Sequence, residues 1–202
     1  MDIIKTLDYI GVFVFAMSGI LAASEKKLDL FGGIIIAFVT ALGGGTLRDI
    51  LLNDKIGWII NIEYIYIVFI GAIFVLLFKK ITKHIRKTIF LFDSIGISIF
   101  TILGVQKAIS FDTPMEIAII FGVMTATFGG VIRDILCNEI PLIFRKEIYA
   151  TACMAGAIVY VSLHSMEVNM LVNTLVSSTV IVSLRTVSVI KKLRLPIIND
   201  RI

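Results

Sequence analysis

Two short blocks combine adjacent glycines with an arginine–aspartate pair and are the strongest candidates for chemistry in the chain. Their residues are Gly43, Gly44, Gly45, Arg48 and Asp49 in the first block and Gly129, Gly130, Arg133 and Asp134 in the second. Adjacent glycines weaken a helix and permit a kink or break. Charges inside apolar segments are costly and usually face a cavity or a partner. We therefore predict two helices that are kinked or broken at the glycines, with polar sites beside these points. The alternatives are snorkelling or capping charges at span ends and glycines that only serve helix packing.

The sequence lacks the motifs of the common enzyme classes. No Gly-Lys-Ser/Thr follows the glycines, as a phosphate loop requires, and neither HExxH nor Gly-x-Ser-x-Gly occurs. His84 and His164 lie near the ends of apolar segments, and Cys137 and Cys153 form no CxxC pair. We therefore predict that the protein is not an enzyme and has no cofactor and no metal site.

The composition indicates an all-α protein that crosses a membrane repeatedly. Of the 202 residues, 58% are hydrophobic and 17% are charged, whereas a soluble domain averages about half apolar and a quarter charged. A span needs roughly 20 apolar residues, and only helices satisfy the backbone of such isolated runs. The first apolar run has no basic leader or small-residue cleavage site, so we expect a retained span. The seven predicted spans are residues 6–24, 31–52, 62–78, 89–109, 115–137, 147–164 and 168–190.

The distribution of basic residues predicts the orientation. Of the 19 lysines and arginines, 13 fall in one set of alternate loops and the C-terminal tail, and two, Lys5 and Lys55, fall on the other side. The positive-inside rule then places the N-terminus outside and the C-terminus in the cytoplasm, in a multi-pass protein of the cell membrane. The cluster at 79–87 can attract anionic lipid headgroups, although an orientation signal explains it equally. The net charge of +4 follows this rule, so we expect no nucleic-acid partner.

An internal repeat underlies both blocks. At an offset of 85 residues, without gaps, 21 of the 71 positions from Asp8 to Phe78 are identical to their partners. The matches include Asp8 with Asp93, Tyr64 with Tyr149, and most of the two glycine–arginine–aspartate blocks. Composition alone gives on the order of one identity in ten, so we interpret the repeat as a gene duplication.

Each repeat holds three spans, an odd number, so the second copy enters the membrane from the opposite side. We predict an inverted 3+3 repeat with units 1–84 and 85–166, followed by a seventh helix and a cytoplasmic tail in 167–202. Inverted repeats are typical of transporters, which bind their substrate near the midplane between the halves.

Two further sets of residues are candidates for a conducting path. Lys146, Glu147 and Tyr149 enter the sixth span, where they form either a solvated cluster or a cytoplasmic mouth that contacts the glycine break of the other repeat. Hydroxyl groups within spans present oxygens to cations without a trapping charge, or they simply bond within their helices; they belong to Ser18, Thr40, Ser98, Thr101 and Thr125. For Lys107 and Arg185, near the ends of their spans, we expect snorkelling.

These blocks at their 85-residue offset, the RKEIYA segment at 145–150 and the three-plus-three-plus-one layout resemble the prokaryotic TRIC (trimeric intracellular cation) channels, over about Leu7 to Ile190. This family overlaps the UPF0126 membrane proteins, which are also labelled glycine transporters. The resemblance implies a homotrimer in which every subunit has its own pore for potassium ions, with kinked second and fifth helices. It also implies pore or gating roles for both glycine–arginine–aspartate blocks and for Lys146, Glu147 and Tyr149.

One departure from the family pattern affects the second block. Phe128 stands where the first block has Gly43, so the fifth helix is expected to be stiffer. A carrier of a small amino acid such as glycine remains the alternative function, because half-helix ends can hold a carboxylate and an ammonium group. Potassium over sodium selectivity and the gating stimulus are not encoded in any motif of this sequence.

Overall fold

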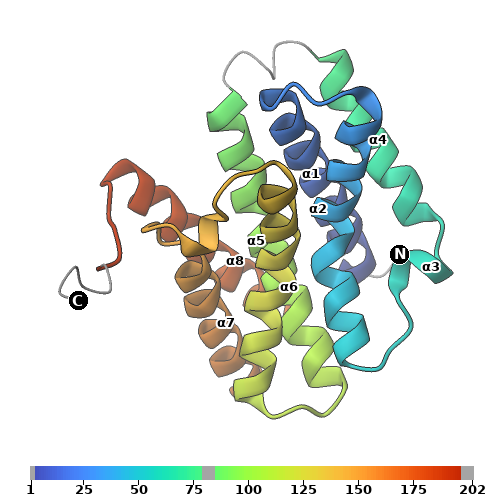
Figure 1. Cartoon of the computed structure of the whole chain (residues 1–202). Helices are drawn as coiled ribbons and strands as arrows, with labels where there is room; N and C mark the ends of the chain where they lie inside the picture. Colours follow the sequence, from blue (N-terminus) through green and yellow to red (C-terminus); the bar gives the residue numbers. More distant parts are fainter. Residues whose placement is uncertain (1–2, 79–84, 197–202) are drawn as a thin grey trace, which may run out of the picture.

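The computed structural model describes residues 3–78 and 85–196, which form a bundle of helices (Figure 1). The elements are α1 (Ile3–Glu25), α2 (Leu30–Leu51), α3 (Gly57–Ile60), α4 (Glu63–Leu77), α5 (Ile85–Ser110), α6 (Met115–Leu136), the 3₁₀ helix η2 (Leu142–Phe144), α7 (Ala150–Ser165) and α8 (Met170–Ile190). An antiparallel bridge between Glu147 and Arg194 is the only β-type pairing in this part of the chain.

The longer helices coincide with the predicted spans. Within the described residues, every helix of 15 residues or more overlaps one predicted segment, and the short α3 and η2 lie in the connections. Five helices are long and apolar enough to cross a membrane, and α4 and α7 are shorter apolar helices. The chain is therefore a multi-pass helical membrane protein. Most of the basic cluster that we interpreted as an orientation signal lies at 79–84, outside the described residues.

Matched residues end matched helices. Asn53 and Asn138 follow α2 and α6 with φ of 53° and 55°, and Lys27 and Asp112 follow α1 and α5 with φ of 57° and 55°. A residue in the left-handed region is a common helix stop, and asparagine and aspartate adopt it at low cost. All four positions obey the 85-residue offset, so the two halves use the same chain breaks.

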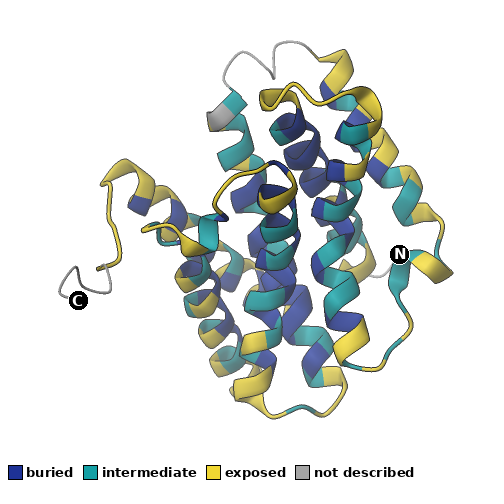
Figure 2. Ribbon diagram, viewed as in Figure 1, coloured by how far each residue is buried: buried dark blue, intermediate teal, exposed yellow. Residues whose placement is uncertain are grey.

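Four helices form the centre of the bundle. α1 packs on α2 and α5, α6 packs on α2 and α5, and their facing surfaces are the most buried part of the molecule (Figure 2). α4 covers the outer side of α1, while α7 and α8 pack against each other and against α5. The last helix, outside the repeat, therefore packs on the bundle as expected.

The two halves meet in a reciprocal close contact between α2 and α6. A Cβ atom placed on Gly44 would lie 2.1 Å from the carbonyl oxygen of Thr125, and one on Gly129 would lie 2.2 Å from the carbonyl oxygen of Thr40. Both contacts join a glycine of one half to the threonine of the other half. Only glycine allows this approach of one backbone to another.

A second reciprocal contact lies between α1 and α5. The Phe100 ring lies over Gly11 and the Phe15 ring over Gly96, and the two rings touch with their centroids 5.0 Å apart. These positions also obey the 85-residue offset. Four glycines and two phenylalanines thus form a packed waist, which we define as Gly11, Phe15, Gly44, Gly96, Phe100 and Gly129.

The predicted helix breaks are absent. α2 and α6 are continuous α-helices from Leu30 to Leu51 and from Met115 to Leu136, through both glycine blocks. The prediction of a break is therefore wrong, while the alternative of a kink at the glycines stays a prediction. At Gly44 and Gly129 the missing side chains instead make room for the facing helix.

Substitution at the waist tests this packing. We expect Gly44→Ala or Gly129→Ala to lower the free energy of unfolding by about 1–3 kcal/mol, because each methyl group would overlap a backbone carbonyl of the facing helix. Gly45→Ala is the matched control: the nearest atom to its Cβ would be 3.7 Å away, so better helix propensity should raise stability by up to ~1 kcal/mol. Unfolding in mixed micelles measures all three variants, and equal effects at the three positions would contradict the close-approach account.

Candidate functional site

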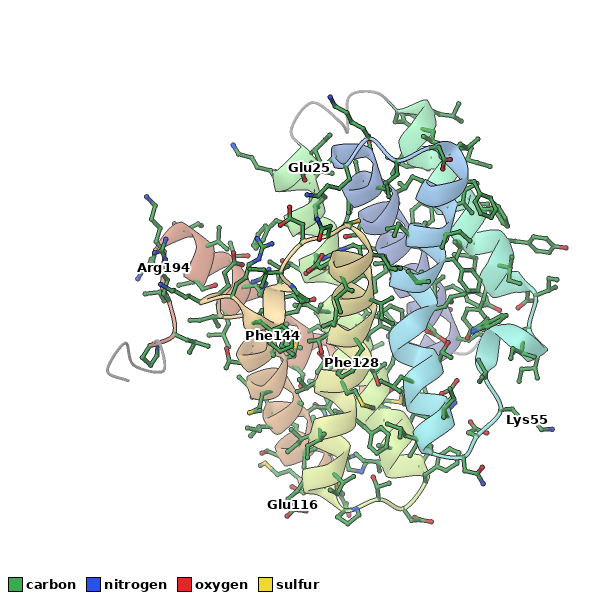
Figure 3. The ribbon with its side chains drawn as sticks, viewed as in Figure 1. Glu25, Lys55, Glu116, Phe128, Phe144 and Arg194 are labelled. Carbon is green, nitrogen blue, oxygen red and sulfur yellow. The ribbon has the colours of Figure 1, made fainter. Side chains whose placement is uncertain are left out.

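Two cavities open at opposite ends of the bundle, one on each side of the waist. The smaller, of about 290 Å³, is lined by the start of α1 and the ends of α2 and α5, and the larger, of about 800 Å³, by the end of α1, the start of α5 and the end of α6. We name them the Asp49 cavity and the Asp134 cavity. Charged side chains gather near both ends, such as Glu25 at one and Glu116 at the other, while Phe128 lies near the middle (Figure 3).

The two cavities are lined by equivalent residues of the two halves. Seven pairs at the 85-residue offset occur in both linings: Ile4 and Ile89, Asp8 and Asp93, Ala22 and Lys107, Glu25 and Ser110, Arg48 and Arg133, Asp49 and Asp134, and Gly57 and Leu142. Each cavity thus has one arginine and two aspartates at matching places.

In the Asp134 cavity, Arg133 is held by two carboxylates. Its Nε donates to Asp134 Oδ1 at 2.9 Å, and its Nη1 donates to Asp93 Oδ1 at 3.0 Å and to Ser18 Oγ at 2.8 Å. The guanidinium is 2% exposed and Asp93 is 1% exposed. A charge at this depth is tolerated only with such partners. The backbone N–H of Leu142 completes the site by donating to Asp134 Oδ2.

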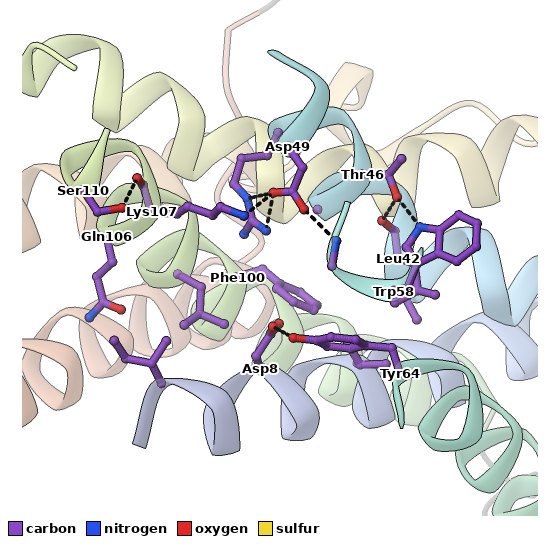
Figure 4. A pocket seen from close by; sticks show the side chains of 17 residues that line it. Asp8, Leu42, Thr46, Asp49, Trp58, Tyr64, Phe100, Gln106, Lys107 and Ser110 are labelled. Carbon is purple, nitrogen blue, oxygen red and sulfur yellow. Dashed lines mark hydrogen bonds and ion pairs between the residues drawn. The ribbon is translucent and has the colours of Figure 1, made fainter. Parts of the chain in front are cut away.

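In the Asp49 cavity the same frame carries an additional cation (Figure 4). Arg48 donates from Nε to Asp49 Oδ1 at 2.8 Å, and the Gly57 N–H donates to Asp49 Oδ2 at 3.2 Å. Lys107 Nζ also binds Asp49 Oδ1, at 2.8 Å, and it reaches Asp54 Oδ2 at 2.7 Å. This ammonium group lowers the pKa of the Asp54 carboxyl in the loop after α2. Lys107 therefore does not snorkel to the surface as expected; it is turned into the cavity.

The first aspartate of each half has a different partner in each cavity. The hydroxyl of Tyr64 donates to Asp8 Oδ2, on the side of the cavity opposite Asp49 (Figure 4). The equivalent Tyr149 hydroxyl has no hydrogen-bond partner among the described residues, and neither has Asp93 Oδ2. Asp93 instead bonds Arg133 through its other oxygen. The two halves thus have equivalent aspartate and tyrosine residues, which differ in the hydrogen bonds that they form.

Arg185 of α8 adds a buried cation to the Asp134 cavity. Its guanidinium lies over the rings of Phe90 and Tyr149, about 5 Å from each centroid, and only 1% of the residue is exposed. It donates to the Ile148 carbonyl at 3.2 Å and to Glu147 at 3.4 Å. The expectation that Arg185 snorkels was wrong, because two aromatic faces and a carbonyl stabilise the charge within the bundle.

Glu147 lines the Asp134 cavity, and Lys146 is its neighbour in the chain. The Lys146 carbonyl accepts a hydrogen bond from the Leu195 N–H at 2.9 Å. Glu147 forms an antiparallel backbone bridge with Arg194, and its side chain forms an ion pair with Arg185. Their partners in these contacts are α8 and the segment that follows it, and the contact with the glycine block of the other repeat stays a prediction. On the rim beyond them, Lys26 lowers the pKa of the Glu139 carboxyl.

The five hydroxyl residues proposed for the path are all buried, and none of them lines either cavity as described here. Thr40, Thr101 and Thr125 donate to the carbonyl four residues earlier in their own helices, and Ser98 to the one three residues earlier. Ser18 is different, because its oxygen accepts from Arg133 of the other half. Sequence reasoning missed Asp8, Asp93 and Lys107 as site residues. The repeat itself contained the signal for the aspartates, since it preserved a carboxylate inside both first spans.

These features define a polytopic helical membrane protein whose two matched halves place equivalent charged cavities at opposite ends. A family model described as "Glycine transporter" matches residues 5–80 and again residues 90–165. A UPF0126 membrane protein of Vibrio cholerae is 40% identical over 78% of this chain and 66% of its own length. The UPF0126 inner membrane protein YadS of Escherichia coli is 37% identical over 76% and 75%.

Solved channel structures share this fold. A TRIC trimeric intracellular cation channel orthologue from Rhodobacter sphaeroides superposes with a TM-score of 0.91 at 31% identity, over 96% of this chain and 100% of that one. A second structure, whose title is "Structural basis for conductance through TRIC cation channels", superposes with a TM-score of 0.87 at 33% identity, over 100% of both chains. The chain belongs to the UPF0126 family, which shares the TRIC fold.

The matched cavities allow a comparison of the two arginines. We expect Arg133→Met to lower the free energy of unfolding by about 3–5 kcal/mol, because it leaves Asp93 and Asp134 buried without a cation. Arg48→Met should cost less, because Lys107 still binds Asp49. Unfolding curves in mixed micelles measure both, with Arg145→Met on the exposed rim as a control expected to cost at most ~1 kcal/mol. Equal losses for the two buried arginines would show that the lysine contributes nothing to Asp49.

Proposed function

We propose that the protein is a channel for monovalent cations, chiefly potassium, with a pore inside each subunit. The observation that carries this proposal is the pair of charged cavities at opposite ends of the bundle, with Phe100 of the waist in the lining of the Asp49 cavity. A path that joined them would pass between equivalent residues of the two halves. The proposal draws on the family relation to solved TRIC structures, whose titles name cation channels.

The pore in this proposal runs between two inverted repeats. Seven helices span the membrane, with units 1–84 and 85–166 in opposite orientations and 167–202 as the added helix and tail. The reciprocal contacts of Gly44 and Gly129 support this arrangement, because a contact in which each half gives the other the same residue is characteristic of a two-fold axis. The N-terminus then lies outside and the C-terminus in the cytoplasm, as the basic loops predict.

The gate in this proposal is the waist, at the middle of α2 and α6. With the helices unbroken and the backbones in contact, the conformation described is closed. Opening requires α2 and α6 to separate or bend at Gly43–Gly45 and Gly129–Gly130, where helices resist bending least. Arg48, Asp49, Arg133 and Asp134 then line the two mouths, and the buried hydroxyls of Thr40 and Thr125 lie beside the opening.

A homotrimer is part of the proposal, because the related structures include a trimeric channel. We expect native mass spectrometry of the detergent-solubilised protein to give three times the mass of the chain. The outward faces of α4 and α8 bear many exposed apolar side chains, which lipids and neighbouring subunits would cover. A stable monomer that still conducts would remove the trimer from the proposal and leave the pore in place.

A carrier of a small amino acid is the second candidate. The Asp49 cavity favours it in one respect: it presents Arg48 and Lys107 to a carboxylate and Asp8 to an ammonium group (Figure 4). The family model is also described as a glycine transporter. Transport rate distinguishes the two candidates, because carriers complete one conformational cycle for each substrate molecule.

The decisive measurement is current through a planar bilayer with unequal potassium chloride on its two sides. We expect discrete unitary currents that reverse near the potassium equilibrium potential, because carboxylates at both mouths favour cations over chloride. Liposomes from the same preparation, with labelled glycine supplied in the external solution, serve as the parallel assay. Silent bilayers together with saturable glycine uptake would reject the channel in favour of the carrier.

A further inference from the structure

Lys107 occupies the place of a bound cation in the Asp49 cavity. Its Nζ lies 2.8 Å from Asp49 Oδ1 and 2.7 Å from Asp54 Oδ2, and 25% of its side chain is exposed. Ammonium and potassium ions are of similar size, and both bind carboxylate oxygens. The lysine reaches this position from the last turn of α5, across the cavity from α2 (Figure 4).

The other half has no cation at the equivalent position. The position equivalent to Lys107 is Ala22, which lines the Asp134 cavity in the same way. One turn further, Ser110 in the Asp49 cavity corresponds to Glu25 in the Asp134 cavity. At these two positions the Asp49 cavity carries the more positive side chain, whereas the other cations of the Asp134 cavity, Lys26, Lys87, Arg145 and Arg185, have no charged counterpart in the Asp49 lining.

Removal of Lys107 would make the charge at the mouth of the Asp49 cavity more negative. Asp8, Asp49 and Asp54 carry three negative charges near this mouth, and Arg48 and Lys107 carry two positive charges. Without the lysine, three carboxylates face one guanidinium. A mouth of that sign raises the local concentration of cations. A permeating ion at this mouth must otherwise displace the lysine from both carboxylates.

We propose that Lys107 is a tethered cation that occupies the cation position between Asp49 and Asp54 and limits cation entry from that end of the pore. At the Asp134 end Ala22 stands at the equivalent place, and Arg185, the buried cation of that cavity, lies over Phe90 and Tyr149 instead of binding Asp134. The inference rests on the proposed channel function. It attributes a difference in cation entry between the two ends of the pore to one residue, Lys107.

The test exchanges the two equivalent residues. In patches of bacterial spheroplasts, where every channel has one orientation, we expect Lys107→Ala to raise the unitary current that enters from the Asp49 side by about twofold or more. Ala22→Lys should lower the current that enters from the Asp134 side. Both changes shift the ratio of the two currents in the same direction, and the double variant should shift it further.

Three controls separate charge from structure. Lys107→Arg should keep the wild-type ratio, because it keeps the charge. Lys5→Ala removes a lysine at the same end that pairs with Glu63 outside the cavity, and it should change nothing. The effect of Lys107→Ala should also shrink between 0.1 M and 1 M salt, since the screening length falls from about 10 Å to 3 Å. An unchanged current ratio in Lys107→Ala would overturn the inference, as would a change that salt does not diminish.

A second measurement needs no current. If Lys107 fills a cation position, its removal leaves Asp49 and Asp54 free to bind a hard cation. We expect millimolar calcium chloride to raise the melting temperature of Lys107→Ala in detergent, but not of the wild type or of Lys107→Ala combined with Asp54→Asn. If the wild type carries no current, the channel proposal fails while this measurement still decides the cation position. No calcium effect in Lys107→Ala would overturn it.

Discussion

The contact between the backbones of α2 and α6 is the constraint on which the rest of the structure depends. Gly44 and Gly129 face the carbonyl groups of Thr125 and Thr40 so closely that any side chain would separate the helices. Because each half supplies the same two residues, the contact fixes the relation between the halves. The ends of α2 and α6, with their arginine–aspartate pairs, are thereby carried to opposite ends of the bundle, where they line the two cavities.

Burial of charge is the second constraint, and each half solves it with the same frame. An aspartate accepts from the preceding arginine and from a backbone N–H eight residues later, at Gly57 or Leu142. These bonds satisfy a carboxylate that would otherwise be costly away from water. The halves differ in what is added: Lys107 on one side, Arg185 between two aromatic rings on the other. The two sites therefore share one frame and differ in the cation that is added to it.

The helices, the repeat and the two charged blocks could be predicted, because the length of an apolar segment and the similarity of two segments are visible in the linear order of residues. This order does not show which neighbour a charged side chain meets. Lys107 and Arg185 both lie near span ends, where snorkelling is the usual outcome, yet both turn inward to partners more than 35 residues away. The role of the glycines could not be predicted for the same reason. Adjacent glycines suggest a break in their own helix, and only the threonine carbonyls of the facing helix show that the glycines allow α2 and α6 to cross in close contact. Asp8 and Asp93 could have been predicted as site residues, since a carboxylate is costly in an apolar span and its presence in both copies indicates a specific role.

The segment after α8 has a mechanical consequence. Leu195 is bonded to the Lys146 carbonyl, and Glu147, the next residue, borders the Asp134 cavity. Anything attached to the end of the chain, whether a tag or a fused domain, is thereby coupled to the rim of that cavity. One backbone hydrogen bond contributes only about 1 kcal/mol net. A force applied at the C-terminus is therefore expected to break the contact between Leu195 and Lys146 before it unfolds α8.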